Sequence, residues 1–119
     1  MKNLTVAEIR QLYPSPIRDS GMPTTAGAYC VGMACLLAYD RWDDADVFPG
    51  EYEIASVLAD INPALDRPGP EYVGDEHDLS LENTLAYAFA WEITTDNDAG
   101  NFEGAWETLG RALTYRLEI

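Results

Sequence analysis

Apolar residues recur along much of this chain at intervals of three and four positions, which is the spacing of one face of an α-helix. The pattern is clearest at Ile54, Val57, Leu58 and Ile61, which predict an amphipathic helix. Asn62-Pro63 follows directly and is expected to end this helix, because the residue before a proline is disfavoured in the helical region.

A shorter helix is predicted near the beginning of the sequence. Thr5 is followed three residues later by Glu8, which is the spacing of a capping box. In that motif the two side chains satisfy backbone N–H groups that the first turn of a helix leaves without partners. The apolar face of this helix would consist of Val6, Ile9 and Leu12.

A second helix is expected to run from Thr24 or Thr25, either of which can cap it, to about Tyr39. It carries no charge until Asp40, so we interpret it as the central and nearly fully buried helix. A ridge of small residues along it would let another helix approach closely. The members of this ridge are Ala28, Gly32 and Cys35.

Two more helices are predicted in the last 40 or so residues, joined by the tight connection 96–100 as a helical hairpin. Ser80 is expected to cap the fourth helix and Asn101 the fifth. In the fourth, the apolar stack is Leu81, Leu85, Phe89 and Ile93, with Tyr87 and Trp91 on another side. In the fifth, the apolar face is Phe102, Trp106, Leu109, Leu113 and Leu117, and Glu107 and Arg111 are spaced to pair on the opposite face.

No stretch of useful length alternates between apolar and polar residues, so no substantial sheet is expected. The sequence therefore predicts an all-α fold, a compact four- or five-helix domain that ends in a helical hairpin. A length of 119 residues suits one domain with its own core, and we expect residues 1–119 to form a single acidic helical domain.

The charge of the chain limits the classes of partner that the protein can bind. There are 21 Asp and Glu residues against 7 Lys and Arg residues, a formal net charge of −14. Such a charge repels phosphate backbones and anionic lipid surfaces, so no direct binding to nucleic acid or to a membrane is expected. A basic protein surface is the partner that this charge favours.

The acidic residues are concentrated in the middle of the sequence. Residues 40–78 contain 12 acids and 2 arginines, a net charge of −10, whereas residues 1–39 sum to +1 and residues 79–119 to −5. Aromatic residues are interleaved with these acids at Trp42, Phe48, Tyr52 and Tyr72. We expect a partner-binding surface formed by Asp43, Asp44, Asp46, Glu51, Glu71, Asp75, Glu76 and Asp78.

One form of this function is an inhibitor that mimics the charge of nucleic acid and occupies a basic site on its partner protein. The plainer alternative is that the acidic segments are solvated loops that keep a small protein soluble. No enzymatic activity and no cofactor are predicted. The sequence does not indicate the oligomeric state.

A small cysteine-dependent hydrolase that uses Cys30 and His77, the only histidine, is the alternative from another functional class. Against it, Cys30 falls well inside the predicted second helix rather than at the positive first turn that activates a thiol. Cys30 and Cys35 are better explained as buried free thiols, which suits a reducing compartment.

Two local patterns lie in the final hairpin. Gly100-Asn101-Phe102-Glu103, followed by Ala105, Leu109 and Ala112-Leu113, resembles the second helix of a tetratricopeptide repeat, which implies a helical hairpin. A single unit cannot bury its own apolar face, so an isolated hairpin is the preferred interpretation. Asp96, Asp98, Gly100 and Glu107 also approach the spacing of a calcium-binding loop. Because a cap at Asn101 would lock Glu107 inside a helix, no metal site is predicted, and calcium binding between Asp96 and Glu107 stays a lesser alternative.

The cellular location is expected to be the cytoplasm. The first residues lack the apolar segment of a secretory signal, and an acidic residue occurs already at Glu8. The uncharged run 26–39 is 14 residues long, which is too short to cross a bilayer.

Overall fold

The computed structural model describes residues 3–17, 29–44, 47–70, 72, 74 and 79–116. Within these residues the fold is all-α and contains no strand. Its helices are α1 (Val6–Leu12), α2 (Val31–Ala38), α3 (Glu51–Ile61), α4 (Leu85–Asp98) and α5 (Phe102–Thr114), with the short 3-10 helices η1 (Pro63–Leu65) and η3 (Leu81–Asn83). The predicted fold class is confirmed.

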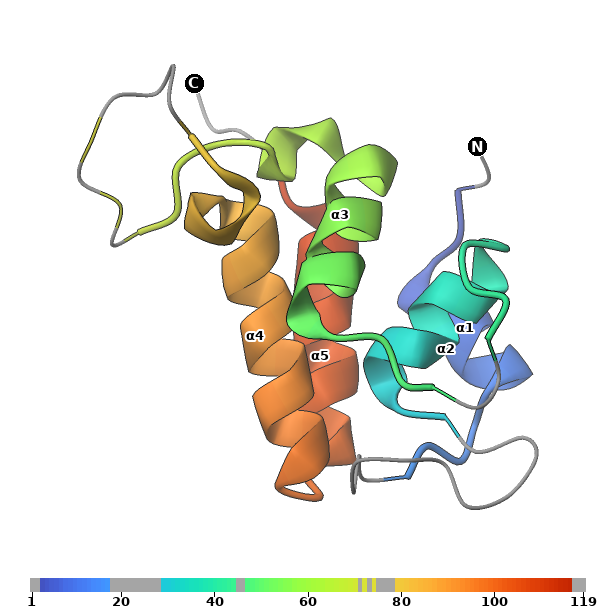
Figure 1. Cartoon of the computed structure of the whole chain (residues 1–119). Coiled ribbons are helices and arrows are strands. Elements are labelled where there is room, and N and C mark those ends of the chain that lie inside the picture. The colour runs from blue at the N-terminus through green and yellow to red at the C-terminus, as the bar shows by residue number, and fades with distance from the viewer. Residues whose placement is uncertain are drawn as a thin grey trace.

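Three helices stand side by side and alternate in direction. Figure 1 shows α3, α4 and α5 running up, down and up, with α4 packed against both of its neighbours. The α4–α5 pair is the helical hairpin that the sequence predicts at its carboxyl-terminal end. On one side of this group lie α1 and α2, and α2 contacts each of the four other helices.

Helix α1 begins with the predicted capping box. The Thr5 hydroxyl accepts a hydrogen bond from the backbone N–H of Glu8, and the Glu8 carboxylate accepts one from the backbone N–H of Thr5. Arg10 attaches α1 to α5, since its guanidinium pairs with Glu103 and lies 5.8 Å from the centre of the Trp106 ring. The hydrogen bond from Arg10 lowers the pKa of the Glu103 carboxyl.

Helix α2 is central and buried as expected, with every residue buried except Leu37, which is half-buried. Its predicted beginning was wrong. Residues 29 and 30 are not helical, and Cys30 is the N-cap, so the helix starts at Val31. The predicted caps Thr24 and Thr25 lie outside the described residues.

The close approach predicted for the small residues of α2 is confirmed at Gly32. A β-carbon placed there would lie 2.3 Å from Cδ1 of Ile54 on α3, far inside van der Waals contact. Glycine at this position therefore lets α3 pack directly on the backbone of α2.

Helix α3 matches its prediction closely. Ile54, Val57 and Leu58 are buried, and the helix ends at Ile61. Asn62 then caps the ends of two helices. Its backbone N–H donates to Leu58 O in α3, and its side-chain amide donates to the carbonyl oxygens of Ala112, in the last turn of α5, and of Tyr115, just after that helix.

Helix α4 differs from its prediction in both its cap and its buried face. Thr84 is the N-cap, with its hydroxyl accepting from the Tyr87 N–H at 3.3 Å, whereas Ser80 precedes only the 3-10 turn η3. Among the residues of the predicted stack only Ile93 is fully buried. The buried positions are Ala86, Ala90, Ile93 and Asn97, because α3 and α5 pack closely on both sides of α4.

Helix α5 is capped by Asn101 as predicted, with the side-chain oxygen accepting from the Gly104 N–H at 3.1 Å. Trp106 and Leu109 are buried. Phe102 and Leu113 are half-buried, and Leu117 lies outside the described residues. Arg111 pairs with Glu92 on α4 at 3.0 Å, so this contact joins the two helices, whereas the sequence predicted that Arg111 would pair with Glu107.

Candidate functional site: an acidic face with an aromatic groove

The turn between α2 and α3 holds two of the acids that the sequence assigns to a partner surface. Asp43 and Asp44 are exposed there. The indole N–H of Trp42 donates to the carbonyl oxygens of Asp44 at 2.8 Å and Val47 at 3.0 Å, which folds the turn around the Trp42 ring. These hydrogen bonds fix the backbone that carries the two acids.

The remaining predicted site residues divide into two groups. Glu51 is half-buried in the first turn of α3, where a carboxylate also interacts favourably with the positive end of the helix. Five of the predicted acids lie outside the described residues: Asp46, Glu71, Asp75, Glu76 and Asp78.

The aromatic residues near these acids are less exposed than a contact surface requires, with one exception. Phe48 is buried against Cys30 and Met33, and Trp42 is half-buried. Tyr52 on α3 has 57% of its surface exposed. Of the four aromatic residues that the sequence places among these acids, only Tyr52 is therefore mostly exposed, since Tyr72 is half-buried as well.

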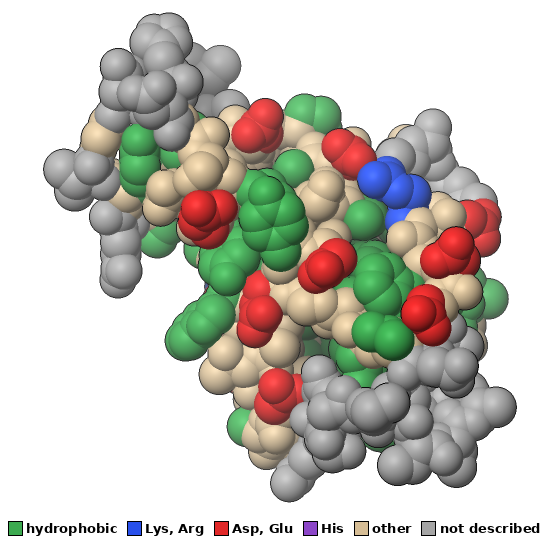
Figure 2. All heavy atoms as spheres, in the orientation of Figure 1, with side chains coloured by type: hydrophobic (Ala, Val, Ile, Leu, Met, Phe, Trp, Pro, Cys, Tyr) green, Lys and Arg blue, Asp and Glu red, His purple; other side chains and the backbone are tan. Residues whose placement is uncertain are grey.

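Acidic side chains are spread over the face formed by α3 and α4, with apolar side chains between them and few basic ones (Figure 2). Some of these acids also have a structural role. Asp60 pairs with Arg41 at 2.7 Å, and the Glu53 carboxylate accepts from the Gly50 N–H at 3.0 Å. The face is thus acidic on a well-ordered helical framework.

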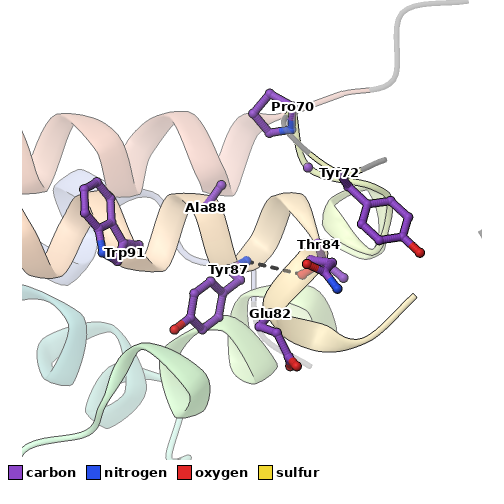
Figure 3. A pocket seen from close by; sticks show the side chains of 9 residues that line it. Pro70, Tyr72, Glu82, Thr84, Tyr87, Ala88 and Trp91 are labelled. Atoms are coloured by element: carbon purple, nitrogen blue, oxygen red, sulfur yellow. Dashed lines mark hydrogen bonds between the residues drawn. The ribbon is translucent and has the colours of Figure 1, made fainter. Parts of the chain in front are cut away.

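An open groove lies beside the first two turns of α4 and has a volume of about 560 Å³ (Figure 3). Backbone hydrogen bonds build its wall. The Gly69 N–H donates to Asn83 O at 2.8 Å, and the Leu85 N–H donates to Arg67 O at 2.8 Å. A β-carbon on Gly69 would lie 3.3 Å from two carbonyl oxygens of this wall, so glycine allows the chain to approach this closely.

The side chains of the groove combine aromatic rings with a carboxylate. Figure 3 shows Tyr87 and Trp91 projecting from neighbouring turns of α4, with Glu82 near Tyr87 and Pro70 beyond Ala88. Trp91 is 56% exposed, although a residue of its size usually buries more. The sequence placed Tyr87 and Trp91 away from the buried stack but did not indicate a groove.

Neither cysteine forms a disulfide and both are buried, as the sequence predicts. Burial raises the pKa of the Cys35 thiol to about 12. Cys30 lies at the N-cap of α2 rather than inside the helix, where its sulfur accepts from the Met33 N–H at 3.4 Å. Only 6% of Cys30 is exposed, and His77, its proposed partner in a hydrolase, lies outside the described residues.

The region considered for calcium does not form a ligand loop. Asp96 and Asp98 belong to the last turn of α4, and Gly100 makes the turn into α5 with a φ of 80°. In the part of the chain that the structure describes, no three His, Cys, Asp or Glu side chains are grouped to hold a metal ion.

No helix among the described residues is both long enough and apolar enough to cross a membrane. No protein-family profile, curated protein or solved structure matches this chain. Its function is therefore argued from the chemistry of its own surface.

Proposed function

We propose that this domain binds a basic surface of another protein through its acidic face, defined as the turn with Asp43 and Asp44 together with the exposed sides of α3 and of the first two turns of α4. The observation that carries the proposal is the composition of this face. Acids are frequent on it, basic side chains are scarce, and Tyr52 and Trp91 are more than half exposed. Aromatic residues are enriched in protein contact surfaces, and a surface with charges of one sign steers a partner of the opposite sign toward it.

A basic protein partner fits this surface better than the other common classes of partner. A net charge of −14 attracts cationic surfaces over a distance and speeds their encounter, whereas it repels phosphates. A protein that occupies a basic nucleic-acid site on its partner would act as an inhibitor, and this remains the specific form that we propose for the interaction.

The experiment begins with the partner. The immobilised domain is exposed to an extract of its source cell at low salt, and bound proteins are released at high salt and identified by mass spectrometry. Association rates of the captured partner are then measured at two salt concentrations. The proposal requires a basic partner whose association slows as salt screens the charges.

A pair of matched variants distinguishes an effect of the acidic face on association from an effect of net charge alone. The first changes Asp43→Asn, Asp44→Asn and Glu51→Gln. The second removes the same number of charges around the α4–α5 turn, through Asp96→Asn, Asp98→Asn and Glu107→Gln. The first variant should slow association and flatten its salt dependence more than the second.

Two results would contradict the proposal. Equal slowing in both variants would show that only the total charge matters. Unchanged rates in both, with the fold intact, would favour acidic loops that only solubilise the domain. Neutralising all eight predicted acids extends the test to Asp46, Glu71, Asp75, Glu76 and Asp78.

A further inference from the structure

We infer that the groove beside α4 receives an arginine side chain from a basic segment of the partner protein, with the side chain lying along the rings of Trp91 and Tyr87 and the guanidinium paired to Glu82. This inference rests on the proposed function and names the contact that would anchor it. It concerns a site that the predicted acids do not include.

The first argument is the geometry of the groove. Trp91 and Tyr87 lie one helical turn apart on α4 and both line the groove, the Trp91 ring on the side of Ala88 and Pro70 and the Tyr87 ring on the side of Glu82. Thr84 holds the first turn of α4, with its hydroxyl donating to Leu81 O at 2.6 Å and accepting from the Tyr87 N–H. The rings therefore project from a capped helix and need no rearrangement of the backbone to bind.

The second argument is the exposure of Trp91. Among the aromatic residues of α4 and α5, Trp106 is 3% exposed while Trp91 is 56% exposed. Burying the rest of a tryptophan ring on binding yields a large contact area, and tryptophan, tyrosine and arginine are the residues most enriched where interfaces are strongest.

The charge of the groove and of the whole protein determines which kind of group can bind there. The described residues that line the groove include Glu82, and none of them is a Lys or Arg. A second copy of this chain would bring another net charge of −14 to the same place, and nucleic acid would bring phosphates, so both are repelled. A cationic segment is the occupant whose charge complements the groove.

Arginine fits this lining better than lysine. Its guanidinium is planar, stacks on aromatic faces and presents paired N–H donors that match a carboxylate. The ammonium of lysine is compact and strongly hydrated, so it gains less from an open aromatic surface. The expected preference is therefore for arginine over lysine at equal charge.

The test uses three short glycine-spaced peptides that contain arginine, lysine or citrulline at the same positions. Binding to the whole protein is followed by the indole N–H signals of its three tryptophans in NMR spectra at low salt. The arginine peptide should shift the Trp91 signal with saturation. The lysine peptide should bind several-fold more weakly, and citrulline, which keeps the shape of arginine without its charge, should not bind.

Variants then locate the contact. Trp91→Ala should lower the affinity for the arginine peptide by about tenfold, and Glu82→Gln should lower it by about threefold. Leu12→Ala is the matched control, since Leu12 is 62% exposed on α1 and lies neither in the groove nor on the acidic face. It should leave the affinity unchanged. Circular dichroism confirms that each variant is folded.

The possible failures are distinguishable. Equal affinities for the arginine and lysine peptides, with no effect of Trp91→Ala, would show that the groove is not an arginine site. The proposal that the acidic face binds a basic partner would still stand. The same holds if the captured partner binds in a salt-dependent manner but Trp91→Ala does not weaken it. If neither peptide binds and no basic partner is captured, both the groove and the proposed function are wrong.

Discussion

The side-chain oxygen of Asn97, near the end of α4, accepts a hydrogen bond of 2.9 Å from the backbone N–H of Val31, the first residue of α2. The amide of Asn97 also donates to the carbonyl oxygen of Ile17 at 3.0 Å. Asn97 is 1% exposed, so it joins three separate parts of the chain where water does not compete.

Replacing this asparagine should destabilise the fold markedly. Asn97→Ala leaves the Val31 N–H and the Ile17 carbonyl without their partner, and a buried polar group without a hydrogen bond costs about 1–3 kcal/mol. We expect a loss of about 2–4 kcal/mol in the free energy of unfolding, measured by urea denaturation. Asn101→Ala, which removes an exposed cap, should cost only about 1 kcal/mol, and an equal loss in both would contradict this assignment.

The contact between Gly32 and Ile54 predicts a non-additive pair of substitutions. Gly32→Ala alone should cost about 1–3 kcal/mol, because the added methyl group meets Cδ1 of Ile54 in a packed core. Ile54→Val removes that atom. In the Ile54→Val background, Gly32→Ala should cost clearly less, because only Cγ1, at 3.1 Å, remains in close contact and alanine favours a helix over glycine by about 1 kcal/mol. Additive costs in a double-mutant cycle would show that the two residues do not meet.

Truncating the two tryptophans of the α4–α5 hairpin should change the stability of the fold by very different amounts. Trp106→Ala removes a ring that is 3% exposed and is expected to cost about 3–5 kcal/mol. Trp91→Ala removes a ring that is 56% exposed and should change stability by no more than about 0.5 kcal/mol. Denaturant unfolding of both variants checks this. A large loss for Trp91→Ala would assign that ring to the core instead of to binding.

The cysteines should be unreactive in the folded protein. Cys30 is 6% exposed and Cys35 is fully buried, so labelling by dithionitrobenzoate should proceed only as the protein unfolds. Labelling of Cys30 in the native state at the rate of a free thiol would contradict the structure and favour the hydrolase alternative. The single variants Cys30→Ala and Cys35→Ala assign each rate.

The raised pKa of Cys35 also predicts how stability depends on pH. The folded protein holds the thiol proton up to about pH 12, whereas the unfolded chain releases it from about pH 9. This contribution is fully present below pH 9 and is lost as the pH rises toward 12. Tyr39, whose pKa burial also raises, acts in the same direction. Cys35→Ala should make stability fall less steeply with pH above about 9 than in the wild type, in urea denaturation at several pH values.

Part of the candidate site was predictable from the sequence. Asp43 and Asp44 were expected on an exposed connection and lie on one, because burying charged side chains without a partner is costly. Trp42 and Phe48 were misplaced, since their rings pack inward in a way that the local sequence does not specify. The groove was missed because its wall pairs the backbone of residues 67–69 with that of residues 83–85.

The sequence by itself determined the helices whose signals are local. The capping box at Thr5, the apolar spacing from Ile54 to Ile61 and the cap at Asn101 each involve residues within one or two turns, so neighbouring side chains suffice to decide them. Tertiary structure decided where α2 begins, which side of α4 is buried and that a groove exists. The Val31 N–H donates its hydrogen bond to the side chain of Asn97, 66 positions away, and Ala86 and Ala90 are buried because α3 and α5 pack on both sides of α4. Such features depend on contacts between segments far apart in the chain, and these contacts exist only once the helices have packed.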